Sequence, residues 1–270
     1  MSRDAVIVST ARTAIGRAYK GGFNDTKGPT LGSYSLKPAI ERAGIEPGEV
    51  DDVLWGSALQ QGTQGGNLAR QVALRAGCPI GTSGMTIDRQ CSSGLMSIAT
   101  AAKQIITDRM DVVAAGGQES ISLVQTKEMR VMPDPEPIEM HGAIYMPMLQ
   151  TAETVAQRYG ISREQQDEYA LQSQQRTAAA QEAGKFDDEI VPVSTTHKVQ
   201  DKETGEISDV AITIDKDEGN RPSTTLEGLN SLKPVMGEGT TITAGNASQL
   251  SDGSSASVLM EAKVAEKKGL

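Results

Sequence analysis

The segment over residues 88–95, DRQCSSGL, combines residue types suited to covalent catalysis. Its cysteine, Cys91, follows a short run over residues 85–89 that we predict as a strand, and it precedes a stretch with helical spacing. At a helix start, free backbone N–H groups and the helix dipole stabilise a thiolate. The same N–H groups can bind the oxygen of a thioester formed on the sulfur, and the small residues Ser92 and Gly94 leave room for a substrate. From residue types alone, Cys91 is either such a nucleophile or a buried structural cysteine.

Strands and helices alternate around this segment. Apolar residues fall on one helical face over residues 95–106, and a buried strand is predicted over residues 112–115. Strand, helix and strand in this order predict a crossover in an α/β sheet. Upstream, the pattern predicts strands over residues 5–9 and 52–55 and helices over residues 31–43 and 67–76. Within the first of these helices, Pro38 predicts a kink or a later helix start.

The composition changes after residue 120. Residues 126–150 are rich in methionine and proline, which is typical of a loop with soft apolar side chains. Ser162 and Gln165 have the spacing of a capping box and predict a helix that ends near Ala183. Farther along, we predict an exposed hairpin or loop over residues 194–225, strands over 241–244 and 258–260 with a loop at 245–253 between them, and a helix over 262–268. The fold class is therefore α/β, with residues 121–240 inserted into a domain formed by residues 1–120 and 241–270.

Length and charge exclude several classes of protein. The 270 residues suffice for a large buried core, and no apolar window is long enough to cross a membrane. The amino terminus lacks the pattern of a signal peptide, and two cysteines cannot form a disulfide framework, so we expect a reducing, cytoplasmic location. A net charge of -9 disfavours nucleic-acid binding, although it allows a small basic site for a phosphorylated ligand.

The remaining candidates for chemistry are weaker. Cys78 lies beside Pro79 after a predicted helix, and we interpret it as structural. His141 and His197 lie in predicted loops, and neither belongs to a cluster with metal-ligand spacing, so we predict no metal site. The sequence also contains no GxGxxG and no Walker loop.

Residues 88–95 resemble the nucleophile motif of the thiolases, Asn-x-x-Cys-x-Ser-Gly, with Asp88 where that motif usually has Asn. Further segments resemble the same family in the same order along essentially the whole chain. They are STARTAIGR (9–17), NLARQVALRAG (67–77), GGQES (116–120), TAETVAQRYG (151–160), ISREQQDE (161–168), FDDEIVPV (186–193) and TAGNASQLSDG (243–253).

This resemblance implies the amino-terminal half of a thiolase. The family fold implies a mixed five-stranded sheet flanked by helices over residues 1–120 and 241–270, with a loop domain on the coenzyme A side over residues 121–240. The family also implies a homodimer or a homotetramer. The implied reaction moves an acyl group from a 3-ketoacyl-CoA to Cys91, releases acetyl-CoA, and then passes the acyl group to a second coenzyme A; the reverse reaction condenses two acyl-CoA molecules.

Three further residues match positions that contact coenzyme A in the family. Ser248 resembles a serine that hydrogen-bonds the pantetheine arm, and Met148 resembles a methionine of the pantetheine tunnel, followed here by Leu149 where relatives often have Gly. Arg221 aligns with an arginine near the nucleotide end. Without the resemblance, these are a turn residue, a loop filler and a solvated charge. Coenzyme A and acyl-CoA enter as substrates, and no covalently bound cofactor is implied.

The sequence contains no Gly-His-Pro, Cys-x-Gly or Asn-Glu-Ala segment, which supply the remaining catalytic groups in the second half of a thiolase. We therefore expect a chain that is incomplete for turnover without that carboxy-terminal half, and an exposed apolar face that drives association. The alternatives are a non-catalytic acyl-CoA-binding or scaffold half-protein, or a related condensing enzyme that acts on carrier-protein substrates. The matches TAETVAQRYG and GNAS argue against the condensing enzyme.

Overall fold

The computed structural model describes residues 3–270, which divide into two compact units. The first unit comprises the described part of Met1–Met129 together with Asp187–Gly219 and Leu250–Leu270. The second unit comprises Arg130–Phe186 and Asn220–Gln249. This division places residues 187–219 with the first unit, whereas we expected them in the insertion; the assignment of either unit to a family domain stays a prediction.

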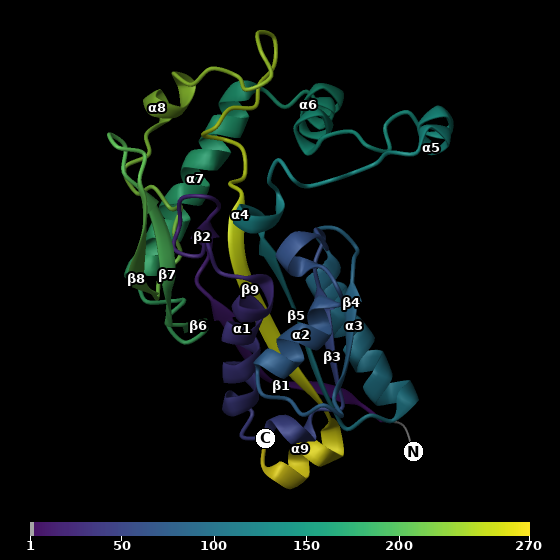
Figure 1. Ribbon diagram of the computed structural model, residues 1–270. Helices are drawn as coiled ribbons and strands as arrows, with labels where there is room; N and C mark the ends of the chain where they lie inside the picture. Colours follow the sequence, from purple (N-terminus) through teal and green to yellow (C-terminus); the bar gives the residue numbers. More distant parts are fainter. Residues whose placement is uncertain (1–2) are drawn as a thin grey trace. The chain divides into compact units, whose positions relative to one another are not determined.

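A mixed sheet forms the centre of the first unit (Figure 1). The parallel strands β4, β3 and β5 pair in that order, and β9 then runs antiparallel to both β5 and β1. The strands are β4 (Ser83–Ile87), β3 (Asp52–Gly56), β5 (Val112–Ser120), β9 (Ser251–Glu261) and β1 (Ala5–Thr13), extended by the short β6 (Ile190–Val191) beside β1 and β2 (Gly16–Arg17) beside β9. The predicted mixed sheet is confirmed, and its five long strands are joined by two strands of two residues each.

Helices cover both faces of this sheet because each strand alternates its side chains. Val53 and Trp55 of β3 belong to a cluster with α1 (Gly28–Arg42) and α2 (Leu68–Arg75). Leu54, between them, packs instead with Ala101 of α3 (Ser93–Lys103). Strand β4, helix α3 and strand β5 form the predicted crossover, with β3 lying between the two strands.

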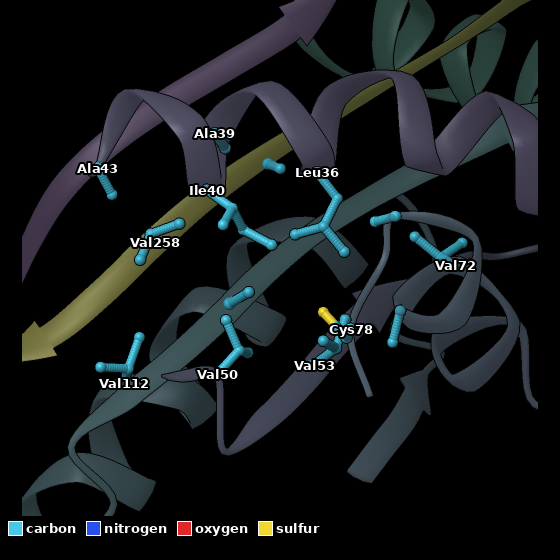
Figure 2. Packing of buried hydrophobic residues seen from close by; sticks show 14 of the residues in the cluster. Leu36, Ala39, Ile40, Ala43, Val50, Val53, Val72, Cys78, Val112 and Val258 are labelled. Atoms are coloured by element: carbon cyan, nitrogen blue, oxygen red, sulfur yellow. The ribbon is translucent and has the colours of Figure 1, made fainter. Parts of the chain in front are cut away.

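The cluster under α1 is the main apolar core (Figure 2). Leu36 and Ile40 project from α1 toward the strands, and Val258 of β9 lies below the helix on the Ala43 side of Ile40. Cys78 lies in the same cluster beside Val53, so its predicted structural role agrees with its position. Burial of the Cys78 thiol raises its pKa to about 11, which makes it a poor nucleophile at neutral pH.

Helix α1 begins earlier than the sequence pattern indicates. It starts at Gly28, with a proline in its first turn, and continues through Pro38 to Arg42. A proline in the first turn removes only an N–H that has no helical partner, so Pro29 favours this start. The prediction that Pro38 could delay the helix start is wrong.

The hairpin of β7 (Val193–Gln200) and β8 (Ile207–Ile214) confirms the exposed hairpin expected over residues 194–225. Asn24 attaches it to the first unit, because its side chain both donates to the carbonyl of Lys198, at 2.8 Å, and accepts from the Lys198 N–H, at 3.0 Å. Beyond the hairpin, Asp217 accepts two hydrogen bonds from the Arg12 guanidinium, at 2.7 and 3.0 Å. These polar contacts explain why residues 187–219 belong with the sheet.

The other elements are short, apart from two helices of the second unit. In the first unit they are α4 (Ile121–Val124), α9 (Ala262–Lys268), single turns at Pro47–Glu49 and Gly62–Gln64, and a π-helical turn at Gln104–Asp108. The second unit contains α5 (Pro135–Met140), α6 (Met148–Tyr159), α7 (Arg163–Glu182) and α8 (Leu226–Asn230). Both hydrogen bonds of the predicted capping box are present at the start of α7. None of the helices within residues 3–270 is long and apolar enough to cross a membrane.

The strand predicted over residues 241–244 is absent from the described chain. Thr241 and Ile242 are irregular, Thr243 makes a single bridge to Pro234, and a turn begins at Ala244. Strand β9 instead begins at Ser251, inside the predicted loop.

Candidate functional site

Cys91 lies in the short connection between β4 and α3, and its side chain is exposed. This position excludes a buried structural cysteine. The residue before it, Gln90, has a φ of 49°, in the left-handed region that non-glycine residues rarely adopt. The Gln90 N–H donates to Asp88 Oδ1, at 2.8 Å, which stabilises this conformation. The Asp88 carboxylate thus makes a contact that the oxygen of an Asn side chain could also make.

Two serines fix the rest of this turn. Ser93 is buried, and its Oγ accepts from the Arg89 N–H, at 2.9 Å, and donates to the carbonyl of Gln90, at 2.6 Å. Ser92 Oγ donates to the carbonyl of Arg89, at 2.9 Å. The backbone on both sides of Cys91 is therefore held by side chains close to it in sequence, which presents the sulfur at the start of α3.

Glycines in the sheet allow α3 to begin close against β3 and β5. A Cβ placed on Gly56 would lie 2.4 Å from the Ser93 carbonyl carbon and 2.6 Å from the Gly94 N. A Cβ on Gly117 would lie 3.3 Å from Gly94 Cα. Sequence reasoning did not single out Gly56; its signal is a glycine at the end of a buried strand, which often marks close backbone approach.

A buried amide joins the carboxyl ends of the strands at this edge of the sheet. Gln64 is fully buried, and its Nε2 donates to Glu119 Oε2, at 3.1 Å, and to Ser57 Oγ, at 3.2 Å, while its Oε1 accepts from the Ser120 N–H, at 2.8 Å. The Ser57 N–H in turn donates to the carbonyl of Ile87, at 3.0 Å, at the end of β4. This network connects the end of β5 to the strand from which the Cys91 turn begins.

In the second unit, a buried carboxylate shapes the segment that leads to Ser248. Glu153 of α6 accepts hydrogen bonds from the N–H groups of Thr241, at 2.7 Å, and Ile242, at 2.8 Å, and from the Thr241 hydroxyl, at 3.1 Å. Burial opposes ionisation of Glu153, but these hydrogen bonds outweigh it and hold the pKa of Glu153 below its usual range. The backbone donors at Thr241 and Ile242 are thereby satisfied without a strand partner.

A second buried carboxylate, Asp167 of α7, fixes the next turn of this segment. Its side chain is fully buried and accepts from Arg163 Nε, at 2.7 Å, and Asn246 Nδ2, at 2.9 Å. Asn246 Oδ1 accepts from the Thr243 N–H, at 2.7 Å. Ser248 follows this braced turn and is exposed. The family resemblance predicts Ser248 as a contact of coenzyme A, and this stays a prediction. No pattern in the sequence points to Glu153 or Asp167, whose partners lie far away in the chain.

The other predicted binding residues also lie in the second unit. Met148 begins α6 with 72% of its surface exposed, and Leu149 is 40% exposed. Arg221 is exposed in the segment between Gly219 and α8. The structure thus places Cys91 in the first unit and groups Ser248, Met148 and Arg221 in the second.

Within the described residues, His141 and His197 belong to no cluster that could hold a metal. His197 lies in β7, opposite Val210, and His141 follows α5. Across residues 3–270, no group of three or more histidine, cysteine, aspartate or glutamate side chains could hold a metal ion.

Comparison with known proteins identifies the family. Residues 5–263 match the family described as thiolase, N-terminal domain. The 3-ketoacyl-CoA thiolase of Bacillus subtilis (strain 168) is 41% identical over 275 residues, an alignment that covers 99% of this chain and 68% of that protein. The chain belongs to the thiolase family.

Two further relatives agree with this assignment. The peroxisomal 3-ketoacyl-CoA thiolase 1 of Arabidopsis thaliana is 41% identical over 268 residues, which cover 99% of this chain and 60% of that protein. The crystal structure of the Bacillus anthracis acetyl-CoA acetyltransferase matches with a TM-score of 0.84 and 36% identity, over 100% of this chain and 68% of that one. This chain therefore spans 60–68% of the length of these thiolases. The predicted family, fold and thiolase class of enzyme are confirmed, whereas the roles of single residues stay predictions.

The two cysteines should differ sharply in reactivity. Iodoacetamide at pH 8 should label Cys91 in the folded chain and leave Cys78 unlabelled, because only Cys91 is exposed and burial raises the pKa of Cys78 to about 11. Peptide mass spectrometry measures both sites. Both should be labelled in urea, and equal labelling of the two in the folded chain would contradict this account.

Gly56→Ala should disturb the start of α3. The added methyl overlaps the backbone of Ser93 and Gly94, and overpacking of this kind costs about 1–3 kcal/mol. We expect a lower free energy of unfolding in urea and faster hydrogen exchange in the first turn of α3. Gly81→Ala is the matched control, because nothing lies within 4 Å of a Cβ there; equal stability of the two variants would refute the close-approach argument.

Glu153→Gln should loosen the segment that leads to Ser248. Because the pKa of Glu153 is lowered in the folded chain, its carboxylate stabilises the fold above the ordinary glutamate pKa, and this stabilisation is lost as the pH falls through the lowered value. The variant should therefore flatten the acid-side decline in stability and accelerate amide exchange at Thr241 and Ile242 about tenfold, which corresponds to about 1.4 kcal/mol. The exposed Glu168→Gln on α7 provides the control, and unchanged exchange at both amides in Glu153→Gln would count against the bracing role.

Proposed function

We propose that Cys91 is the nucleophile of a thiolase acyl transfer and that the acyl donors and acceptors are coenzyme A thioesters and coenzyme A. The observation that carries this proposal is the exposed sulfur at the start of α3, in a turn fixed by Asp88, Ser92 and Ser93, within a chain of the thiolase family. An exposed cysteine at a helix start is accessible to an acyl donor, as a nucleophile must be.

The reaction proceeds in two half-reactions. The Cys91 thiolate attacks the 3-keto carbonyl of a 3-ketoacyl-CoA, the bond between carbons 2 and 3 breaks, and the departing acetyl-CoA carbanion takes up a proton. The thiol of a second coenzyme A then loses its proton and attacks the resulting thioester, which releases the shortened acyl-CoA and regenerates the Cys91 thiolate. Dividing the transfer between two covalent steps replaces one difficult step by two easier ones. Backbone N–H groups at the α3 start are suited to binding the thioester oxygen.

In this proposal, residues of the second unit bind coenzyme A. Ser248, beyond the turn braced by Glu153 and Asp167, donates to the pantetheine arm. Met148 and the following Leu149 lie along the arm at the start of α6, and Arg221 pairs with phosphate at the nucleotide end. No metal is needed for this chemistry, and coenzyme A acts as substrate.

The assembly and location that we propose follow the family. We expect a homodimer or homotetramer in the reducing cytoplasm. The chain spans 68% and 60% of the length of the Bacillus subtilis and Arabidopsis thaliana thiolases. We therefore propose the catalytic cycle, including its proton transfers, for the whole enzyme.

Cys91→Ala should abolish acyl-enzyme formation. Incubation with acetyl-CoA should add one acetyl group to the unaltered chain, located at Cys91 by peptide mass spectrometry, because a thioester bond needs the sulfur. Cys78→Ala is the matched control and should retain the label. An acetyl group that persists in Cys91→Ala would remove Cys91 from the mechanism, and failure of the unaltered chain to acylate while it binds acetyl-CoA would favour a non-catalytic acyl-CoA-binding protein.

A further inference from the structure

Glu119 lies on the face of β5 against which α3 packs. Ala115, earlier in the same strand, belongs to the apolar cluster under α3, and a Cβ on Gly117 would lie 3.3 Å from Gly94 Cα in the first turn of this helix. Because alternate residues of a strand point to the same face of a sheet, Glu119 continues this row past the start of α3. Its side chain is therefore on the Cys91 side of the sheet.

The Glu119 carboxylate holds the loop over residues 57–67, which connects β3 to α2. Its Oε1 accepts a hydrogen bond from the Ala58 N–H, at 2.5 Å, and its Oε2 accepts one from Gln64 Nε2, at 3.1 Å. Gln64 Nε2 also donates to the carbonyl of Leu59, at 3.0 Å. Both carboxylate oxygens are thus engaged by this loop, one at its beginning and one at the single turn before its end.

The loop leaves the sheet beside the Cys91 turn. Strands β3 and β4 are adjacent and parallel, so the segments that follow them begin at the same edge of the sheet. The Ser57 N–H donates to the carbonyl of Ile87, at 3.0 Å, which joins the beginning of the loop to the end of β4. The loop over residues 57–67 and the turn that carries the exposed Cys91 sulfur are therefore neighbours.

A carboxylate is a costly group with which to hold this loop. Glu119 is half-buried, and no cation pairs with it among residues 3–270. Removing a carboxylate from water without a paired cation costs free energy, so stability alone does not favour Glu119 at this position. A defined geometry of the loop does favour it, because a carboxylate accepts from both donors at once, whereas an amide has one acceptor oxygen.

We infer that Glu119 is a positioning residue for acyl transfer: by fixing the loop beside the Cys91 turn, it limits the orientations in which the thioester carbonyl of an acyl-CoA meets the Cys91 sulfur. This inference rests on the proposed nucleophile and adds to it a residue that acts through the loop. Holding reactants in the right geometry accounts for a large part of the rate of such reactions. Because the proposed contacts to coenzyme A lie in the second unit, loss of the Glu119 carboxylate should slow acylation and spare acyl-CoA binding.

The test follows acetylation of Cys91 in the full chain by intact-protein mass spectrometry at several acetyl-CoA concentrations. Glu119→Ala removes both acceptors and should lower the maximal acetylation rate about tenfold, and the isosteric Glu119→Gln, which retains one acceptor, should lower it about threefold. The acetyl-CoA concentration at half-maximal rate should remain unchanged in both variants. Alkylation of Cys91 by iodoacetamide should proceed at the rate of the unaltered chain, because this small reagent does not depend on a fixed orientation.

Glu41→Ala is the matched control, since it removes an exposed carboxylate on α1 and should be acetylated as the unaltered chain is. Unaltered maximal rates in both Glu119 variants would overturn the positioning role and leave the proposed function intact. Equal losses of acetylation and alkylation, a change in the half-maximal concentration alone, or labelling of the buried Cys78 in the folded variants would also overturn it, because each indicates general loosening or altered binding. An unaltered chain that binds acetyl-CoA without becoming acetylated would defeat the inference together with the proposed nucleophile.

Discussion

The close approach of the first turn of α3 to β3 and β5 is the constraint on which the candidate nucleophile depends. Gly56 leaves no room for a side chain against Ser93 and Gly94, so the helix start is held directly against sheet backbone. Because Ser93 is buried there and bonds both Arg89 and Gln90, the contact with the sheet also fixes the turn before the helix. The turn that carries the exposed sulfur of Cys91 is therefore fixed against the sheet. The small residues Ser93 and Gly94 allow α3 to begin close to the sheet backbone, and they also leave the sulfur accessible.

A different kind of interaction organises the second unit. Among the twenty residues of α7, the one buried residue is Asp167, so this helix is not attached by an apolar stripe. It is attached by side chains with several partners each: Arg163 and Asp167 near its start, and Gln174 about two to three turns farther on. Buried and fully paired polar groups specify one arrangement more narrowly than apolar contacts do. Such an arrangement suits the unit to which we assign the recognition of coenzyme A.

Structural features that depend on residues adjacent in the chain could be predicted from the sequence. Features that depend on contacts between residues far apart in the chain could not. The Cys91 turn and the α7 capping box follow from residues within a few positions of one another, and the β7–β8 hairpin follows from two strands that are adjacent in the chain; all three are present. The strand expected over residues 241–244 does not form because the N–H groups of Thr241 and Ile242 donate to Glu153, 88 and 89 positions earlier. Likewise, the contact between Gly56 and Ser93 depends on how α3 packs across the sheet, which no local pattern contains. The family resemblance pointed to Ser248 and Arg221 as binding residues. It did not point to Glu153, Asp167 and Gln174, which bind the segments that carry them.

Cys91 is fixed by close backbone packing, whereas the predicted binding residues of the second unit are fixed by hydrogen bonds. The reactivity of the thiol and the affinity for coenzyme A can therefore be altered separately. We expect the reactivity of Cys91 to depend on backbone packing in the first unit, where a methyl group on Gly56 would overlap the start of α3. The affinity for coenzyme A proposed here depends on hydrogen bonds in the second unit, where Gln174 and Glu153 each satisfy more than one backbone or amide donor. Substitutions in one unit should therefore change thiol chemistry while leaving phosphate recognition intact, and substitutions in the other should do the reverse. Effects of substitutions at distant sites without shared partners are generally additive. The nucleophile and the ligand site can therefore be tested by separate measurements, one of thiol reactivity and one of coenzyme A affinity.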